Sequence, residues 1–289
     1  MKVTKATHST QLKSLIDSRF WLLGIAAGLI AIHLTLTWRA DDSNLLSSSF
    51  LFWLAAGWLV WEKRDSLNFQ SGLISSLAGI LLIAIVAIRS VSLPSINFLN
   101  ASPFISALGL ALLASGIVGL KQYWRELTIL FALGIPKVLL APLIETKIAL
   151  WTAQFSTFLL WYTGFDISRE GRFLYMPTGA VEVDTACSGV QSAFQLFSIA
   201  VLVLVMFPTN GVKRIFIPIL AFLLAFVVNT FRVVLMALLA VSQNEGAFHF
   251  WHEGEGSLIF SVISVLLFGL LYFGLLQQAD GENQDAEKL

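Results

Sequence analysis

The sequence predicts an all-α polytopic membrane protein with about eight transmembrane helices and a short extracytoplasmic β-hairpin. Hydrophobic residues make up 57% of the 289-residue chain and charged residues only 12%. A soluble globular chain has roughly 45–50% apolar and about 25% charged residues. Mean hydropathy is +0.80. The apolar residues also gather in runs that approach the roughly 20 residues needed to cross a bilayer, and short polar segments separate these runs.

Eight apolar runs are the expected spans. They cover residues 20–37, 47–61, 72–88, 104–120, 127–143, 189–207, 215–241 and 257–276. A ninth stretch, 148–163, is rich in aromatic residues but is interrupted by polar residues such as Thr152 and Ser156. We expect it to form a re-entrant or interfacial helix, with its tryptophans at the depth of the lipid headgroups.

The lysine and arginine positions predict that both termini are cytoplasmic. With the N-terminus inside, eleven of these residues fall in cytoplasmic segments and five in outer segments, and a cytoplasmic excess is the usual bias. Making 148–163 a true span would place Lys213 and Arg214 outside and weaken that bias. The expected parts are a cytoplasmic segment (1–19), a single transmembrane domain (20–276) and a polar cytoplasmic tail (277–289). The transmembrane domain contains an outer loop (144–186) and a catalytic core (182–256).

The outer loop is the largest element expected outside the membrane. Within it, residues 172–176 and 180–184 have the pattern of two strands joined by a Pro-Thr-Gly turn, and this hairpin leads to Cys187. A single cysteine excludes an intrachain disulfide and a cysteine-based zinc site. We also find no glycine-rich phosphate loop, so we expect no cofactor. Basic and acidic residues number 18 each, and no basic patch indicates a nucleic-acid partner.

Arg232 is the most unusual residue of the seventh span. An arginine near the centre of a bilayer costs about 2.5–3.5 kcal/mol, so we expect it to face protein or water. Asn229 lies three residues earlier on the same helical face, where its side chain would hold the guanidinium. Alternatively, Arg232 forms a purely structural ion pair with Asp184 or Glu182.

Cys187 and His252 complete a candidate site with Arg232. Cys187 precedes Ser188 and Gly189 at the outer start of the sixth span, and a helix N-terminus favours the thiolate form of cysteine. His252 lies outside, just before the last span, and histidine suits proton transfer near neutral pH. A thiol, an imidazole and a cation on one side of the membrane are the groups that acyl transfer requires.

Two other functions fit the same residues. His249, His252 and an acidic ligand, Glu253 or Glu255, could form the metal site of a metal-dependent membrane protease. A transporter or assembly scaffold is the other alternative, with Arg232 in a polar pathway and Cys187 serving only to pack.

Three motifs resemble those of the exosortase/archaeosortase family. The segment Glu-Val-Asp-Thr-Ala-Cys-Ser-Gly-Val-Gln-Ser at 182–192 resembles the nucleophile motif of that family. Asn-Thr-Phe-Arg at 229–232 resembles its arginine motif, and His252 with Gly256 resembles its His-x-x-x-Gly motif. Gln191 stands where many relatives have arginine, which is compatible with the cyanobacterial branch, the cyanoexosortases.

The resemblance implies a membrane cysteine protease and transpeptidase of the cell (inner or plasma) membrane. Its expected substrates are membrane-anchored proteins with a C-terminal sorting signal: a short motif such as Pro-Glu-Pro, a transmembrane helix and a basic cluster. The acceptor is unknown, with a polysaccharide or a lipid as candidates. Cys187 would be the nucleophile that forms a thioester, Arg232 the stabiliser of negative charge and His252 the general base and acid. The supporting residues are Asn229, Ser188, Gly189, His249 and Gly256, of which His249 competes with His252 for the role of base.

Overall fold

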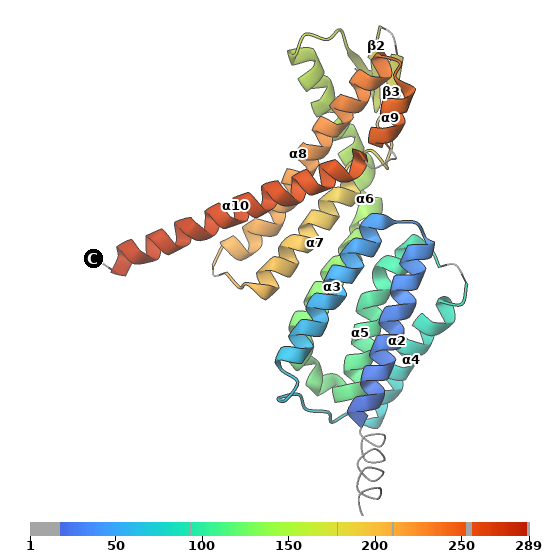
Figure 1. The fold of residues 1–289 in the computed structure, drawn as a ribbon, viewed down its shortest axis with the longest axis vertical. Coiled ribbons are helices and arrows are strands. Elements are labelled where there is room, and N and C mark those ends of the chain that lie inside the picture. Colours follow the sequence, from blue (N-terminus) through green and yellow to red (C-terminus); the bar gives the residue numbers. More distant parts are fainter. Residues whose placement is uncertain (1–17, 93, 178, 210, 253–255, 288–289) are drawn as a thin grey trace, which may run out of the picture. The chain divides into compact units, whose positions relative to one another are not determined.

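The structure is a computed structural model that describes residues 18–92, 94–177, 179–209, 211–252 and 256–287. The chain divides into two compact units, Met1–Val138 and Leu139–Leu289, which we describe one at a time (Figure 1). The predicted N-terminal segment 1–19 lies almost wholly outside the described residues.

Helices build the first unit. In order, they are α2 (Ser18–Arg39), α3 (Ser43–Glu62), α4 (Leu73–Arg89), α5 (Ile96–Gly119), the 3₁₀ helix η1 (Leu120–Tyr123) and the first part of α6 (Trp124–Tyr162). Asp42 and Ser95 cap α3 and α5 by accepting hydrogen bonds from the backbone N–H groups of Leu45 and Phe98. These caps satisfy donors that the start of a helix leaves unpaired. Within the unit, α5 packs against both α2 and α4.

Polar and small residues make the closest contacts of the first unit. The ring nitrogens of His33 in α2 lie 3.0 Å from the hydroxyls of Ser102 and Ser49, in α5 and α3, and all three side chains are buried. A neutral imidazole has one donor and one acceptor, so it can satisfy both hydroxyls in an apolar interior. α4 and α5 meet at Gly79 and Gly109, where a Cβ on Gly79 would lie 2.6 Å from the carbonyl oxygen of Gly109. Helices in membranes commonly pack through such small residues.

The second unit contains the rest of α6, a small sheet and four further helices. They are β1 (Ser168–Glu170), β2 (Phe173–Met176), β3 (Gly179–Glu182), α7 (Val190–Met206), α8 (Lys213–Val241), α9 (Glu245–His252) and α10 (Gly256–Glu287). α8 is the central element, because it contacts α7, α9, α10 and β3. Figure 1 shows α7 and α8 side by side.

The sheet has one strand more than the sequence predicts. β2 and β3 form the expected antiparallel hairpin, and β1 pairs with the other edge of β2. Along β2, Leu174 and Met176 are buried whereas Phe173 and Tyr175 are exposed, as the two-residue period of a strand requires. Thr178, the middle residue of the predicted turn, lies outside the described residues. The sequence analysis missed β1 because its three residues are all exposed and carry no apolar alternation.

The structure differs most from the prediction in α6. We expected a span at 127–143 and a separate re-entrant or interfacial helix at 148–163, but one helix of 39 residues continues through both. Residues 144–162 of the predicted outer loop are therefore helical. The polar residues between the two runs, Glu145, Thr146 and Lys147, lower the hydropathy without including a glycine or proline, so the helical hydrogen bonds continue through them. The prediction of a separate helix was wrong because it took the fall in hydropathy at 145–147 as a helix boundary.

The described residues contain five helical segments that are long and apolar enough to cross a membrane. One of them, Ile96–Tyr162, runs through α5, η1 and α6. α4 and α7 are apolar but shorter, with 17 residues each. These helices make the chain a multi-pass membrane protein, while the count of eight spans and the orientation stay predictions. α10 continues as a helix into the predicted polar tail, to Glu287.

Candidate active site

The loop that carries Cys187 connects β3 to α7 without regular structure of its own. Two side chains shape it from within. Asp184 Oδ1 accepts a hydrogen bond of 2.8 Å from the backbone N–H of Cys187, and Ser188 Oγ donates to the carbonyl oxygen of Thr185 at 2.7 Å. Short polar side chains commonly stabilise turns in this way. The turn brings Cys187, which is 9% exposed, into the buried core between the sheet and α8.

Gly189 ends this loop and directly precedes α7. Its backbone is left-handed, with φ 87° and ψ 0°, a conformation that other residues rarely adopt. A Cβ at this position would also lie 2.6 Å from the side chain of Asn229. The left-handed backbone and the close approach of Asn229 therefore both require glycine at position 189. This explains the glycine in the Ser-Gly pair of the motif.

Cys187 and His252 are in direct contact. The distance between Cys187 Sγ and His252 Nε2 is 3.0 Å, so the imidazole can accept the thiol proton or donate to the thiolate. His252 is the last residue of α9, a helix that the sequence analysis treated as a loop. The ring of Phe248, one turn earlier, stacks on the imidazole with centroids 5.3 Å apart and an interplanar angle of 15°. α9 thus positions the imidazole against the sulfur.

Arg232 joins the same cluster through the backbone of His252. Its Nη2 donates to the carbonyl oxygen of His252 at 2.7 Å. Its Nε is buried and has no hydrogen-bond partner among the residues that the structure describes. The two acidic residues considered as ion-pair partners make other contacts, since Asp184 caps Cys187 and Glu182 pairs with Arg172 at 3.0 Å.

Asn229 binds a different group from the one we expected. Its Nδ2 donates to the carbonyl oxygen of Cys187 at 2.8 Å, instead of holding the guanidinium of Arg232. The expected helical neighbourhood of the two residues is present in α8, but Asn229 is turned toward the cysteine loop, against Gly189. The sequence spacing within α8 could not indicate this, because the acceptor comes from another element.

Two residues of α6 also contact this site, and the sequence analysis did not assign them to it. Thr152 Oγ1 donates to the carbonyl oxygen of Ser188 at 2.9 Å, and Ser156 Oγ donates to the carbonyl oxygen of Thr230 at 3.3 Å. Both side chains are fully buried. The available signal was the i, i+4 spacing of two small polar residues on one face of an apolar helix.

His249 and Gly256, which the sequence analysis names as supporting residues, both lie in the second unit. His249 lies on α9, three residues before His252, and the cysteine contact belongs to His252. Gly256 begins α10, where a Cβ would lie 2.9 Å from the ring of Phe250. This close approach explains a small residue four positions after His252.

The metal-site alternative gains no support from the described residues. No group of three His, Cys, Asp or Glu side chains among them is placed to hold a metal ion, and the proposed ligands Glu253 and Glu255 lie outside the described part of the chain. A metal on His252 Nε2 would also have to replace its contact with Cys187.

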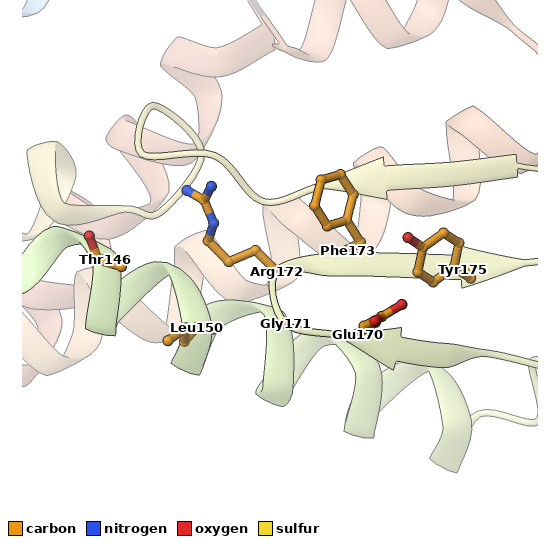
Figure 2. Close-up of a pocket in the computed structure, with 7 residues that line it drawn as sticks. All are labelled: Thr146, Leu150, Glu170, Gly171, Arg172, Phe173 and Tyr175. Carbon is orange, nitrogen blue, oxygen red and sulfur yellow. The ribbon is translucent and has the colours of Figure 1, made fainter.

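A hollow of about 500 Å³ lies between α6 and the β1–β2 hairpin (Figure 2). Its lining residues are Thr146, Leu150, Glu170, Gly171, Arg172, Phe173 and Tyr175. Its lining includes none of the three candidate catalytic residues. The hollow is therefore separate from the contact between the thiol and the imidazole.

The fold and the site together define a polytopic membrane protein that brings together a cysteine just before α7, an arginine within α8 and a histidine at the end of α9. The chain belongs to the family described as Transmembrane exosortase (Exosortase_EpsH), which matches residues 38–269. This match includes the three residues and confirms the predicted family.

One curated relative supports the same assignment. Probable archaeosortase E of Methanocaldococcus jannaschii is 34% identical to the chain over 107 residues. The aligned segment is 37% of this chain and 55% of the relative, so the chain spans about half the length of the curated relative that it matches. No solved structure matches the chain. The cyanobacterial branch stays a prediction.

Proposed function

We propose that the protein is a cysteine-type peptidase and transpeptidase that cuts the C-terminal sorting signals of membrane-anchored, exported proteins and transfers the cut chain to an acceptor. Membership of the exosortase family supports the sorting role. The observation that carries the cysteine chemistry is the 3.0 Å distance between Cys187 Sγ and His252 Nε2. The expected topology assigns this site to the extracytoplasmic face and both termini to the cytoplasm.

The proposed reaction begins with transfer of the thiol proton from Cys187 to His252. The thiolate then attacks the scissile carbonyl carbon, and a C–S bond forms while the carbonyl oxygen takes up negative charge. When the C–N bond breaks, the imidazolium gives its proton to the leaving amine, and a thioester remains on Cys187. The imidazole next takes a proton from the acceptor amine, hydroxyl or water as that group attacks the thioester, and the thiol is regenerated.

Arg232 is assigned to the oxygen that becomes negative. Its Nη2 already holds the carbonyl oxygen of His252, while its Nε has no partner among the described residues. A donor without a partner can bind the oxyanion, which exists only during the reaction. An interaction that is made only in the transition state lowers the barrier. In other enzymes, such a donor contributes about 2.7–4 kcal/mol.

The site also suggests how the substrate is bound. We assign the transmembrane helix of the sorting signal to the bilayer beside the spans, and the motif that precedes it to the outer side of the protein. The exposed rings of Phe173 and Tyr175, with centroids 6.3 Å apart, offer an apolar surface for prolines beside the hollow. Aromatic surfaces are a common means of binding proline-rich peptides.

The decisive experiment follows the processing of a membrane-anchored reporter that ends in Pro-Glu-Pro, a helix and a basic cluster. The wild-type chain should shorten the reporter, and hydroxylamine should release a hydroxamate of the reporter from Cys187. Cys187→Ala should abolish both products at unchanged expression, because no other residue of the chain can form the thioester. Ser242→Ala, which removes an exposed hydroxyl that bonds only within its own helical turn, is the matched control and should process normally.

Continued cleavage by Cys187→Ala would overturn the nucleophile assignment. Chelation provides a separate check: loss of cleavage with EDTA, together with resistance to thiol alkylation, would favour the metal-dependent alternative.

A further inference from the structure

The carbonyl groups at the end of the cysteine loop need partners from outside the loop. Cys187, Ser188 and Gly189 are buried. The carbonyl of Gly189 accepts from the backbone N–H of Ala193 in α7 at 2.9 Å, but the carbonyls of Cys187 and Ser188 lie before the helix that could pair them. A buried carbonyl without a partner is costly, and more so where lipid excludes water. The hydrogen-bond donors of the Cys187 and Ser188 carbonyls therefore determine how firmly the loop is held.

Two different helices supply these donors. α8 provides the side-chain amide of Asn229 for the carbonyl oxygen of Cys187, at 2.8 Å. α6 provides the hydroxyl of Thr152 for the carbonyl oxygen of Ser188, at 2.9 Å. Consecutive peptide groups are thus held from two directions, immediately before the left-handed turn at Gly189.

The face of α6 around Thr152 is built for close approach. Ala149 and Ala153 are both fully buried in the same core cluster as Cys187, and short side chains allow helix backbones to come together. One turn beyond Thr152, Ser156 donates to the carbonyl oxygen of Thr230 in α8. α6 is therefore tied both to the cysteine loop and to the helix that carries Asn229 and Arg232.

We propose that Thr152 is a positioning residue of the active site: by holding the carbonyl of Ser188, it fixes the direction in which the Cys187 thiol faces His252. The inference deepens the proposed function, on which its catalytic meaning rests. A reacting group displaced by about 1 Å can slow an enzyme by about 10²-fold, so a single hydrogen bond to the residue directly after Cys187 is enough to matter.

The test compares Thr152→Val, which keeps the shape but removes the donor, with Thr152→Ser, which restores the donor. The matched control is Thr157→Val on the same helix, where the lost hydroxyl bonds only to Ala153 of its own helix. Two readouts are measured for each full-length variant in membranes. One is the rate at which the reporter is processed. The other is the pH at which alkylation of Cys187 by iodoacetamide is half-maximal.

The alkylation readout is specific because Cys187 is the only cysteine of the chain. Among the described residues, the charged or titratable groups at the thiol and its contacts include His252, Arg232 and Asp184, and all three remain in every variant. A shift of the alkylation midpoint therefore reports the position of the thiol among them.

We expect Thr152→Val to process the reporter about 10- to 100-fold more slowly and to move the alkylation midpoint to higher pH. Thr152→Ser should return both values toward wild type, and Thr157→Val should leave both unchanged. Wild-type processing and alkylation in Thr152→Val would overturn the proposal. So would a loss in Thr152→Val that merely follows its folded fraction, measured by thermal unfolding in detergent, or a failure of Thr152→Ser to rescue.

The two proposals fail in different ways. If wild-type protein does not process the reporter but Thr152→Val still shifts the alkylation midpoint, the proposed function is wrong while the placement of the thiol by Thr152 stands. If processing is normal and the midpoint is unchanged in Thr152→Val, the positioning role alone is wrong.

Discussion

Three of the side chains at the site donate to the backbone carbonyls of Cys187, Ser188 and His252. Asn229 binds the carbonyl of Cys187, Thr152 that of Ser188 and Arg232 that of His252. Each acceptor belongs to a residue at or beside a reacting group. The side-chain donors therefore hold the backbone from which the thiol and the imidazole extend, and the reacting atoms remain free to exchange a proton.

Gly189 is the residue whose replacement should reveal this arrangement most simply. Gly189→Ala would place a methyl group against Asn229 at 2.6 Å and force a left-handed backbone on alanine. The strain should cost about 1–3 kcal/mol, and relief by moving Asn229 should release the carbonyl of Cys187. We expect a lower unfolding midpoint in detergent and at least a tenfold loss of reporter processing. A variant with wild-type values for both would show that the loop tolerates another conformation.

At the level of single residues, the sequence predicted the members of the site better than their contacts. Cys187, Arg232 and His252 stood out because the first is unique, the second is costly in lipid and the third suits proton transfer, and the structure brings all three together. The acceptor of Asn229 could not be predicted, because it belongs to a loop far along the chain. Thr152 was missed because its polarity was taken as a sign of a lipid interface rather than of a buried hydrogen bond.

At the level of elements, α9 explains how the histidine is placed. The helix has eight residues, starts with Asn244 accepting from the backbone N–H of Ala247 at 3.0 Å, and ends at His252. The carbonyl groups at the end of a helix lack intrahelical partners and carry partial negative charge. Arg232 supplies both a donor and a positive charge at that end, so one guanidinium anchors the element that carries His252.

This anchoring role can be separated from charge stabilisation by two substitutions. Arg232→Lys retains a charge and a single donor group, and Arg232→Ala retains neither. We expect Arg232→Lys to preserve rapid alkylation of Cys187. It should process the reporter about 10²- to 10³-fold more slowly, because the planar guanidinium, which can donate to two acceptors at once, is lost. Arg232→Ala should lose both alkylation at neutral pH and processing. Equal alkylation in the two variants would contradict the anchoring of α9 by this residue.

The sequence predicted the elements that contain a long apolar run and missed the elements that do not. Each of the eight apolar runs lies in a helix to within one residue at either end. α9 escaped detection because it has only eight residues, five of which are aromatic or histidine. β1 has no apolar residue, so only its pairing with β2 defines it. The junction within α6 shows that a dip in hydropathy does not end a helix when the dip contains no helix breaker.

For the whole molecule, the topology expected from the charges brings the site to one side of the membrane. α7 begins directly after the cysteine loop, and α6 and α8 contact that loop through Thr152 and Asn229. Successive spans of opposite direction make such a meeting possible. The fold therefore agrees with a single-sided site, and the side itself is a prediction from lysine and arginine.

That orientation can be measured with cysteines placed in a Cys187→Ala background, where no other thiol is present. Ser168→Cys lies on the exposed strand β1, and Ser66→Cys lies in the exposed link between α3 and α4. We expect a membrane-impermeant maleimide added to intact cells to label the first variant and to label the second only after the cells are opened. The reverse pattern would invert the topology and would place the site toward the cytoplasm.

A further consequence concerns the oxidation of Cys187, because the chain has no second cysteine. Oxidants convert reactive thiolates to sulfenic acid, and many proteins limit this damage by forming a disulfide with a second cysteine. This chain contains only one cysteine, so that route is closed within the molecule. With the proposed chemistry and the predicted orientation, the state of the thiol would then depend on reductants outside the cytoplasm, and on how well the buried loop keeps peroxide away from the sulfur.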